Sequence, residues 1–207
     1  MTDHPVLDER RQLCDLFTEL GPDAPTLCEG WTTRDLAAHL WAREHRPDAG
    51  PGLVMSEGFF ARHTAKVEAK VATRPYEEIV DDLHSGPTRL WPGRFLPEFD
   101  VHEWFVHHED VRRPNDLGPR DLNDIEPLVW KVLTTRWAKM LTKGLDVGLR
   151  LETADGRSDD VRTGDGQVVL TGAPGELLLH LFGRPAAVVV TGDDDAVRRF
   201  QQSSLGL

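Results

Sequence analysis

The segment EWFVHHEDVRR, residues 103–113, places two adjacent histidines and three acidic residues among Trp, Phe and Val. Glu103 and His107 are four residues apart, so on an α-helix they share one face, with Cβ atoms roughly 6 Å apart. Apolar residues occupy most other directions around this helix, which predicts that it is buried in a helical bundle. A buried carboxylate beside a buried imidazole is costly unless both are paired, and a divalent cation would pair with both. A Glu–His hydrogen bond inside the bundle explains the same pair, and the spacing leaves both interpretations open.

A metal site needs a third ligand, and His39 in the segment DLAAHLWARE is the best candidate. It shares a helical face with leucines and has two small alanines beside it, although a lone histidine in such surroundings is more often a core residue. His108 is adjacent to His107 and competes with it as a ligand, whereas His102 is expected to point away from Glu103. Three further histidines, in polar surroundings or near a helix end, are interpreted as surface residues: His45, His63 and His84.

The first two thirds of the chain shows helical periodicity interrupted by proline and glycine. This pattern predicts helices at residues 6–20, 32–46, 57–73, 76–85, 98–112 and 124–142. Thr32 and Asp35 fit a capping box, which fixes the start of the second helix. Loops are expected after residue 46, where two prolines and two glycines cluster, and in GPTRLWPGRFLP, which holds three prolines.

From about residue 146 the pattern changes to the alternation of a strand. LDVGLRLETADG carries Val147, Leu149 and Leu151 on one face and ends in Asp-Gly, a hairpin signal. GQVVLTG and AAVVVTG predict further strands, and APGELLLHLFG and DDDAVRRFQQ predict helices. The sequence therefore predicts a mainly α protein of two domains, a helical bundle over residues 1–143 and a small α+β module over residues 144–207.

The composition argues against several classes of partner. Lys and Arg number 24 against 35 Asp and Glu, and the net charge of -11 would repel nucleic acid and anionic lipid. No run approaches 18 apolar residues, and MTDHPVLDERRQL lacks the basic and apolar regions of a signal peptide. Two cysteines, Cys14 and Cys28, are too few for a disulfide scaffold. We therefore expect a cytoplasmic protein that binds neither nucleic acid nor membranes.

Two segments together carry a resemblance to a known family. PTLCEGWTTRDLAAHLWAREHRPDA resembles the pattern G-W-[ST]-x-[RK]-D-[LV]-x-x-H-[LV] of the DinB-like superfamily of actinobacterial metal-binding proteins, and EWFVHHEDV resembles its E-x-x-V-H-x-x-D element. Within that superfamily the chain is similar to the mycothiol-dependent maleylpyruvate isomerase-like family. The resemblance implies a DinB-like four-helix bundle through about residue 142, followed by a small module like a sterol carrier protein.

The resemblance also implies a metal centre and a chemistry. Matched position by position, the ligands are His39, Glu103 and His107, and the ion is zinc or another divalent metal. Three protein ligands leave one coordination position open, as in catalytic zinc sites. The implied protein is a metal-dependent isomerase or thiol transferase that uses mycothiol, a low-molecular-weight thiol, on a small electrophilic substrate. A homodimer is a further implication. Relatives with other roles keep two alternatives open, a non-catalytic metal or small-ligand binding or sensing protein and a metal hydrolase with Glu44 or Glu109 as its base.

Four more residues lie in or near the segments that carry the resemblance or that it implies are functional. Asp110 matches the trailing Asp of the family pattern and would either orient an imidazole or cap its helix against the arginines that follow. Trp31 is expected to pack the bundle, and Cys28 to be a small buried residue without a catalytic role. Arg184, in FGRPAA, is the nearest candidate for an arginine that the isomerase uses from its C-terminal module.

Overall fold

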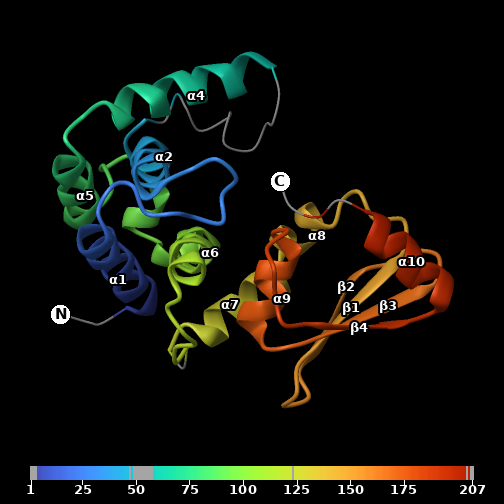
Figure 1. Cartoon of the computed structure of the whole chain (residues 1–207). Helices are drawn as coiled ribbons and strands as arrows, with labels where there is room; N and C mark the ends of the chain where they lie inside the picture. The colour runs from blue at the N-terminus through green and yellow to red at the C-terminus, as the bar shows by residue number, and fades with distance from the viewer. Residues whose placement is uncertain (1–3, 47, 49–57, 123, 204, 206–207) are drawn as a thin grey trace. The chain divides into compact units, whose positions relative to one another are not determined.

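The computed structural model of the chain describes residues 4–46, 48, 58–122, 124–203 and 205 (Figure 1). Packing divides it into two compact units, Met1–Asp121 and Leu122–Leu207. The first is helical, and the second combines helices with a small sheet. This confirms the prediction of a mainly α chain with an α+β module at its C-terminal end. No helix among the described residues combines the length and the apolar character that crossing a membrane requires.

Among its described residues the first unit has five α-helices, whose bounds follow the predicted ones closely. They are α1 (Pro5–Leu20), α2 (Thr33–His45), α4 (Gly58–Ala72), α5 (Tyr76–Ser85) and α6 (Val101–Arg112). The capping box predicted at the start of α2 is present, with the Thr32 amide donating to Asp35 Oδ2 over 2.9 Å. The helix predicted at 98–112 begins later because Pro97–Asp100 forms a 3-10 turn. Residue 57 and most of the loop predicted after residue 46 lie outside the described residues.

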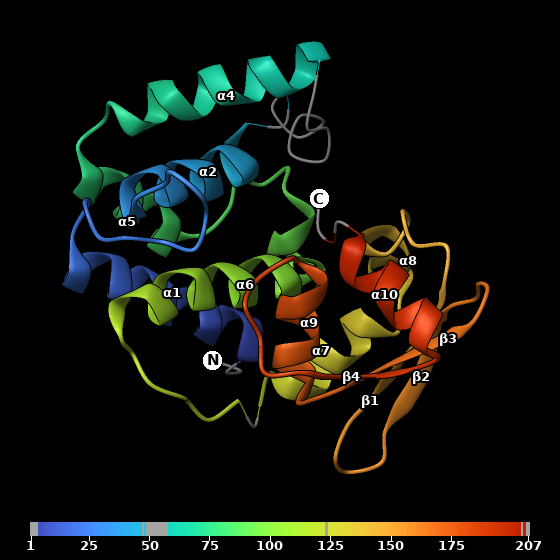
Figure 2. The ribbon, with the colours of Figure 1, turned by 45° about the vertical axis from the view of Figure 1, so that its right-hand side comes forward.

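The helices of this unit pack in two close pairs joined by α5. Figures 1 and 2 show α1 beside α6 and α2 beside α4, and α5 contacts both α1 and α2. Each of these helices except α4 contributes a large side chain with no more than 1% exposure, among them Phe17, Leu40, Leu83 and Phe105. This core fixes α2 and α6, the two helices that carry the predicted ligands.

A buried ion pair ties α1 to α2 inside this core. The Arg10 guanidinium makes two hydrogen bonds to the Glu44 carboxylate, of 2.5 and 2.7 Å. Its Nε donates to the Leu83 carbonyl over 2.8 Å, and the Trp104 ring lies 4.5 Å from the guanidinium carbon. Glu44 is therefore committed to a structural pair.

The part of the second unit that the structure describes holds a four-stranded sheet and four α-helices. Its strands are β1 (Gly148–Glu152), β2 (Ser158–Arg162), β3 (Gln167–Thr171) and β4 (Val189–Gly192), in the order β2-β1-β3-β4. β1 pairs antiparallel with β2 through the predicted Asp-Gly hairpin and parallel with β3, and β3 pairs antiparallel with β4. The helices are α7 (Glu126–Leu133), α8 (Arg136–Leu141), α9 (Pro174–Leu181) and α10 (Asp194–Gln202).

The long helix predicted at 124–142 is instead two helices, α7 and α8. The chain leaves the helical conformation at Thr135, whose ψ is -170°. Both threonines at the break bond to nearby carbonyls, Thr134 to Lys131 over 3.1 Å and Thr135 to Val132 over 2.7 Å. Such local bonds compete with the helical ladder. α7 then packs on α9 and α8 on β2, so by packing both belong to the second unit. The boundary falls between residues 121 and 122, whereas the sequence predicted it between 143 and 144.

Candidate metal centre

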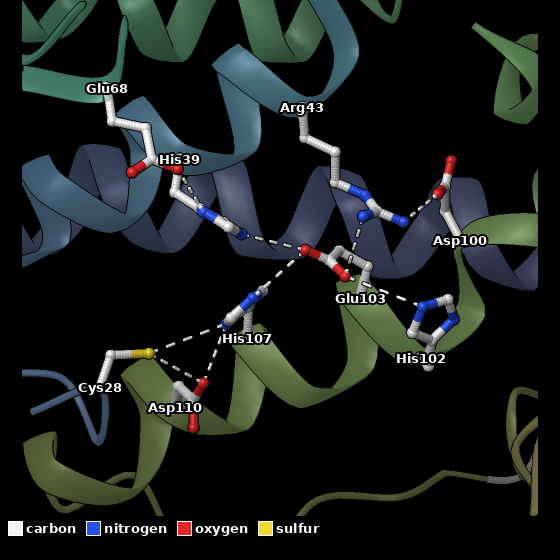
Figure 3. Close-up of polar contacts among 9 residues, drawn as sticks. All are labelled: Cys28, His39, Arg43, Glu68, Asp100, His102, Glu103, His107 and Asp110. Atoms are coloured by element: carbon white, nitrogen blue, oxygen red, sulfur yellow. Dashed lines mark hydrogen bonds and ion pairs between the residues drawn. The ribbon is translucent and has the colours of Figure 1, made fainter. Parts of the chain in front are cut away.

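The structure brings the three predicted ligands together between α2 and α6. His39 Nε2 lies 3.2 Å from Glu103 Oε1, and His107 Nε2 lies 3.4 Å from the same oxygen (Figure 3). These three atoms all lie within 4.8 Å of one another. The three side chains keep only 12–15% exposure. The pair four residues apart on α6 therefore meets its third member from a different helix, at distances that suit a shared cation.

Each imidazole is held from behind by a second carboxylate. His39 Nδ1 lies 2.8 Å from Glu68 Oε1, on α4, and His107 Nδ1 lies 2.9 Å from Asp110 Oδ2, one turn further along α6. A neutral imidazole that donates its Nδ1 proton to a carboxylate directs the lone pair of Nε2 the other way. Carboxylates commonly orient metal-binding histidines in this manner. Both rings thus present Nε2 to the same point.

The second carboxylate oxygen of Glu103, Oε2, faces the positively charged side chain of Arg43. Arg43, one turn after His39 on α2, places its NH1 3.5 Å from Glu103 Oε2. Its NH2 lies 3.2 Å from Asp100 Oδ1, and the other oxygen of Asp100 accepts from the Trp91 indole over 2.7 Å. Arg43 is therefore anchored on its far side, and Glu103 Oε1 is left to the two imidazoles.

The buried charges of the site shift one another's protonation. Burial favours the neutral imidazole, but the hydrogen bonds to Glu103 and Glu68 outweigh it and raise the pKa of His39. Burial also opposes the charge on His107, yet Asp110 and Glu103 raise its pKa well above the usual value. Burial raises the pKa of the Glu103 carboxyl, but the charge of Arg43 and the hydrogen bonds from both imidazoles outweigh this effect. The pKa of Glu103 therefore falls well below its usual range. The carboxylates thus favour two positive charges at the imidazoles.

The other two histidines of α6 are His108, which competed with His107 as a candidate ligand, and His102, which was expected to point away from the site. His108, the competitor of His107, turns toward α1, where its Nδ1 lies 2.8 Å from Glu9 Oε1. His102 was expected to point away from Glu103, but this prediction is wrong, because its Nε2 lies 3.8 Å from Glu103 Oε2. Burial lowers the pKa of His102 to about 4, so it faces the carboxylate as a neutral ring.

The histidines interpreted as surface residues lie away from the three ligands. His63 pairs with Asp48 over 2.8 Å and His84 with Asp15 over 3.1 Å, and each keeps 36% side-chain exposure. His45 is half-buried rather than exposed, because its ring stacks on Trp41 with 4.6 Å between centroids.

Three residues of the site carried no role in the sequence analysis: Glu68, Arg43 and Asp100. Arg43 lies four residues after His39 on the same helix, so helical spacing could have placed it beside the site. Glu68 is brought in by the packing of α4 on α2, for which the sequence has no local signal. Of the two roles considered for Asp110, the geometry favours the orientation of an imidazole, since Asp110 is fully buried against His107.

The surroundings of His39 include an aromatic wall and a small cavity. The Trp31 ring lies 5.2 Å from the His39 ring, centroid to centroid. Trp31 and Glu68 also line a cavity of about 250 Å³ between α2 and α4, together with Asp35 and four alanines.

In the second unit, Arg184 donates to the Phe182 carbonyl over 2.9 Å and lines a separate cavity of about 750 Å³.

Comparisons with known proteins agree with this architecture. Residues 4–90 match the family model of the mycothiol maleylpyruvate isomerase N-terminal domain. A search of curated proteins finds no match. Among solved structures, the crystal structure of the mycothiol-dependent maleylpyruvate isomerase is similar over 90% of this chain and 91% of that one, with 16% identity and a TM-score of 0.57. A point mutant of that isomerase matches over the same shares with 15% identity and a TM-score of 0.57. The fold is thus that of the isomerase, and residues 4–90 are similar to the N-terminal domain of the mycothiol maleylpyruvate isomerase family.

Proposed function

We propose that the protein is a metal-dependent enzyme of the thiol-dependent isomerase or thiol-transferase type, which uses mycothiol on a small electrophilic substrate. One observation carries the proposal. Two imidazoles from different helices and one carboxylate direct His39 Nε2, His107 Nε2 and Glu103 Oε1 to one point. The family match supports the thiol-dependent type of reaction.

The donor set fits a divalent cation by its chemistry. His39, Glu103 and His107 would hold it, and two imidazoles with one carboxylate suit zinc, although nickel, iron or manganese accept the same donors. When bound, such an ion supplies a Lewis acid that lowers the pKa of a coordinated thiol or water.

Charge balance at the site also supports this fit. Three carboxylates, those of Glu68, Glu103 and Asp110, contact the two imidazoles, and Arg43 pairs with Glu103 and with Asp100. The raised pKa values of both histidines indicate that these carboxylates favour positive charge at the two rings. A divalent ion held by the rings would supply positive charge at the same place.

The protein's own groups would position the ligands and limit access to them. Glu68 and Asp110 hold the two rings through Nδ1, which fixes the direction of each Nε2. Arg43 occupies the second oxygen of Glu103 and so favours coordination through the first. The small exposed fraction of the ligands would keep the reacting thiol away from most of the solvent.

The alternatives gain less support from the described residues. A hydrolase would need a base beside the site, and both residues considered for that role are engaged elsewhere. Glu44 is paired with Arg10, and Glu109 accepts from Arg120 over 2.8 Å and from Arg113 over 3.1 Å. A closed, non-catalytic site would need a fourth ligand, and His108 is turned toward Glu9.

The first test is the metal content of the full-length protein purified without a histidine tag. About one divalent ion per chain is expected from the wild type. His39→Ala, Glu103→Ala and His107→Ala should each lose most of it, because each removes one of three ligands. His84→Ala is the matched control, since it removes an imidazole outside the site and should keep the full content. Full content in any of the three ligand variants would remove that residue from the proposed site.

The second test separates thiol chemistry from metal storage. Calorimetric titration of the metal-loaded protein with mycothiol should show saturable binding, and the analogue with a hydroxyl in place of the thiol should bind much more weakly. Equal binding of both compounds, or of neither, would contradict the proposal of a thiol-dependent enzyme. Specific thiol binding would justify a screen of small conjugated electrophiles for isomerisation or thiol addition.

A further inference from the structure

A second group of metal-ligating side chains lies on the opposite side of the His107 ring. Cys28 Sγ lies 3.2 Å from Asp110 Oδ2 and 4.0 Å from His107 Nδ1, and the last two atoms are 2.9 Å apart (Figure 3). The three atoms lie within 4.8 Å of one another. Nε2 of the same ring faces Glu103. One imidazole therefore separates two sets of donor atoms.

The distances suit a tetrahedral cation after small side-chain rotations. Zinc binds sulfur at about 2.3 Å, imidazole nitrogen at about 2.0–2.1 Å and carboxylate oxygen at about 2.0–2.2 Å, which separates neighbouring donors by roughly 3.4–3.6 Å in a tetrahedron. The observed separations of 2.9, 3.2 and 4.0 Å each differ from these values by about half an ångström. Such shifts lie within the range of rotations about the side-chain bonds.

The loop that carries Cys28 is fixed to the helix that carries the other two donors. The Leu27 amide donates to the Asp110 carbonyl over 2.9 Å, which ties the loop between α1 and α2 to the last turn of α6. Within the loop, the Thr26 hydroxyl donates to the Trp31 carbonyl over 2.9 Å and accepts from the Cys28 amide over 3.2 Å. The sulfur is thus held near the other donors before any ion binds.

We propose that Cys28, His107 and Asp110 form a second cation site, which binds one soft, thiophilic divalent ion such as Cd²⁺. Thiolate is a soft ligand that the set of His39, Glu103 and His107 lacks, so the two sets differ in the ions they prefer. On binding, the Cys28 thiol and the Nδ1 of the protonated His107 ring each release a proton to the buffer, and the ring retains a single proton, on Nε2. The inference goes beyond the function proposed above and shares only His107 with it.

The shared imidazole makes occupation of the two sets exclusive. A neutral imidazole has one nitrogen that donates a proton and one that accepts. With an ion on Nδ1, the Nε2 proton points at Glu103 Oε1, 3.4 Å away, and His107 no longer serves the first set. A thiophilic ion bound at Cys28 would therefore displace the ion held by His39 and Glu103 and inhibit any reaction that depends on it.

The test is a titration of the full-length, ion-free protein with cadmium chloride, followed by the ultraviolet charge-transfer band between thiolate and cadmium. The band is expected to saturate at one cadmium per chain in the wild type and to be lost in Cys28→Ser. Cys14→Ser is the matched control, because Cys14 is fully buried in α1, and it should keep the band. A wild type without the band, or Cys28→Ser with it, would overturn the proposal.

Two further measurements separate this site from the first set and from a loss of folding. His39→Ala should keep the cadmium band, so a failure of the first set as a metal centre leaves this result unchanged; loss of the band in His39→Ala would overturn the proposal.

Circular dichroism of each variant checks its fold, and Cys28→Ala gives a second variant without the thiol. Zinc-loaded wild type dialysed against cadmium should hold one ion per chain in total, and two ions would overturn the exclusive use of His107.

Discussion

Removal of Glu68 should weaken metal binding although this residue is not among the proposed ligands. Its carboxylate lies 2.8 Å from His39 Nδ1 and is 17% exposed, so it both orients the ring and favours its role as a ligand. Loss of such a partner typically lowers metal affinity by about 10–100-fold. That range corresponds to about 1.4–2.8 kcal/mol. We expect Glu68→Ala to fall within it. Glu68→Gln should fall near the tenfold end, because its amide oxygen still accepts the Nδ1 proton.

The affinities can be compared by competition with a chelating indicator at fixed pH and ionic strength. Glu77→Gln is a suitable control, since it removes an exposed carboxylate at the start of α5, far from the three ligands in sequence. Equal affinity of wild type and Glu68→Ala would refute the idea that this carboxylate supports His39. Equal losses in Glu68→Ala and Glu77→Gln would assign the effect to general electrostatics.

Three further predictions concern stability. Arg43→Met should destabilise the ion-free protein by about 3–5 kcal/mol in urea unfolding, because it leaves the buried Asp100 without its cation and removes one of the positive charges that face Glu103; full stability would show that these pairs are dispensable. Burial opposes the charge of Glu9, but His108 and Arg120 outweigh it and lower the pKa. The carboxylate therefore stabilises the fold above the ordinary glutamate pKa of 4.5, and the stability deficit of Glu9→Gln at pH 7 should shrink as pH falls below that value. A fragment of residues 122–207 should fold and one of residues 144–207 should aggregate, because only the first retains α7 against α9, as heteronuclear NMR spectra of the two fragments can establish.

The sequence predicted most element bounds because local signals were strong. The capping box at Thr32 set the start of α2, and Gly86 ended α5 where the pattern stopped. Local signals were misleading where two short helices replaced one. Apolar periodicity continues through Thr134 and Thr135, so only the tertiary packing of α7 and α8 reveals the break and places both helices in the second compact unit.

The residues of the candidate site likewise fall into two groups, those that the local sequence pattern predicts and those that only tertiary packing brings to the site. Glu103 and His107 follow from spacing within one helix, and His39 was the best third candidate by its place among leucines and alanines, which the family resemblance then supported. Glu68 could not be predicted, because its partner is 29 residues away and the pairing of α4 with α2 has no local signature. The orientation of His108 depends on Glu9, 99 residues earlier in the chain.

The origin of the proposed ligands in separate helices has a consequence for folding. Glu103 and His107 meet as soon as α6 forms, whereas His39 is 64 residues from Glu103 and arrives only when α2 docks. Closing such a loop costs conformational entropy that a bound ion could help to offset. A growing chain would thus offer an incoming cation a weak two-ligand site first and the full set only after the bundle has assembled. Ion capture would then report the completion of tertiary structure, and supply of the metal during synthesis would influence the rate of its last step.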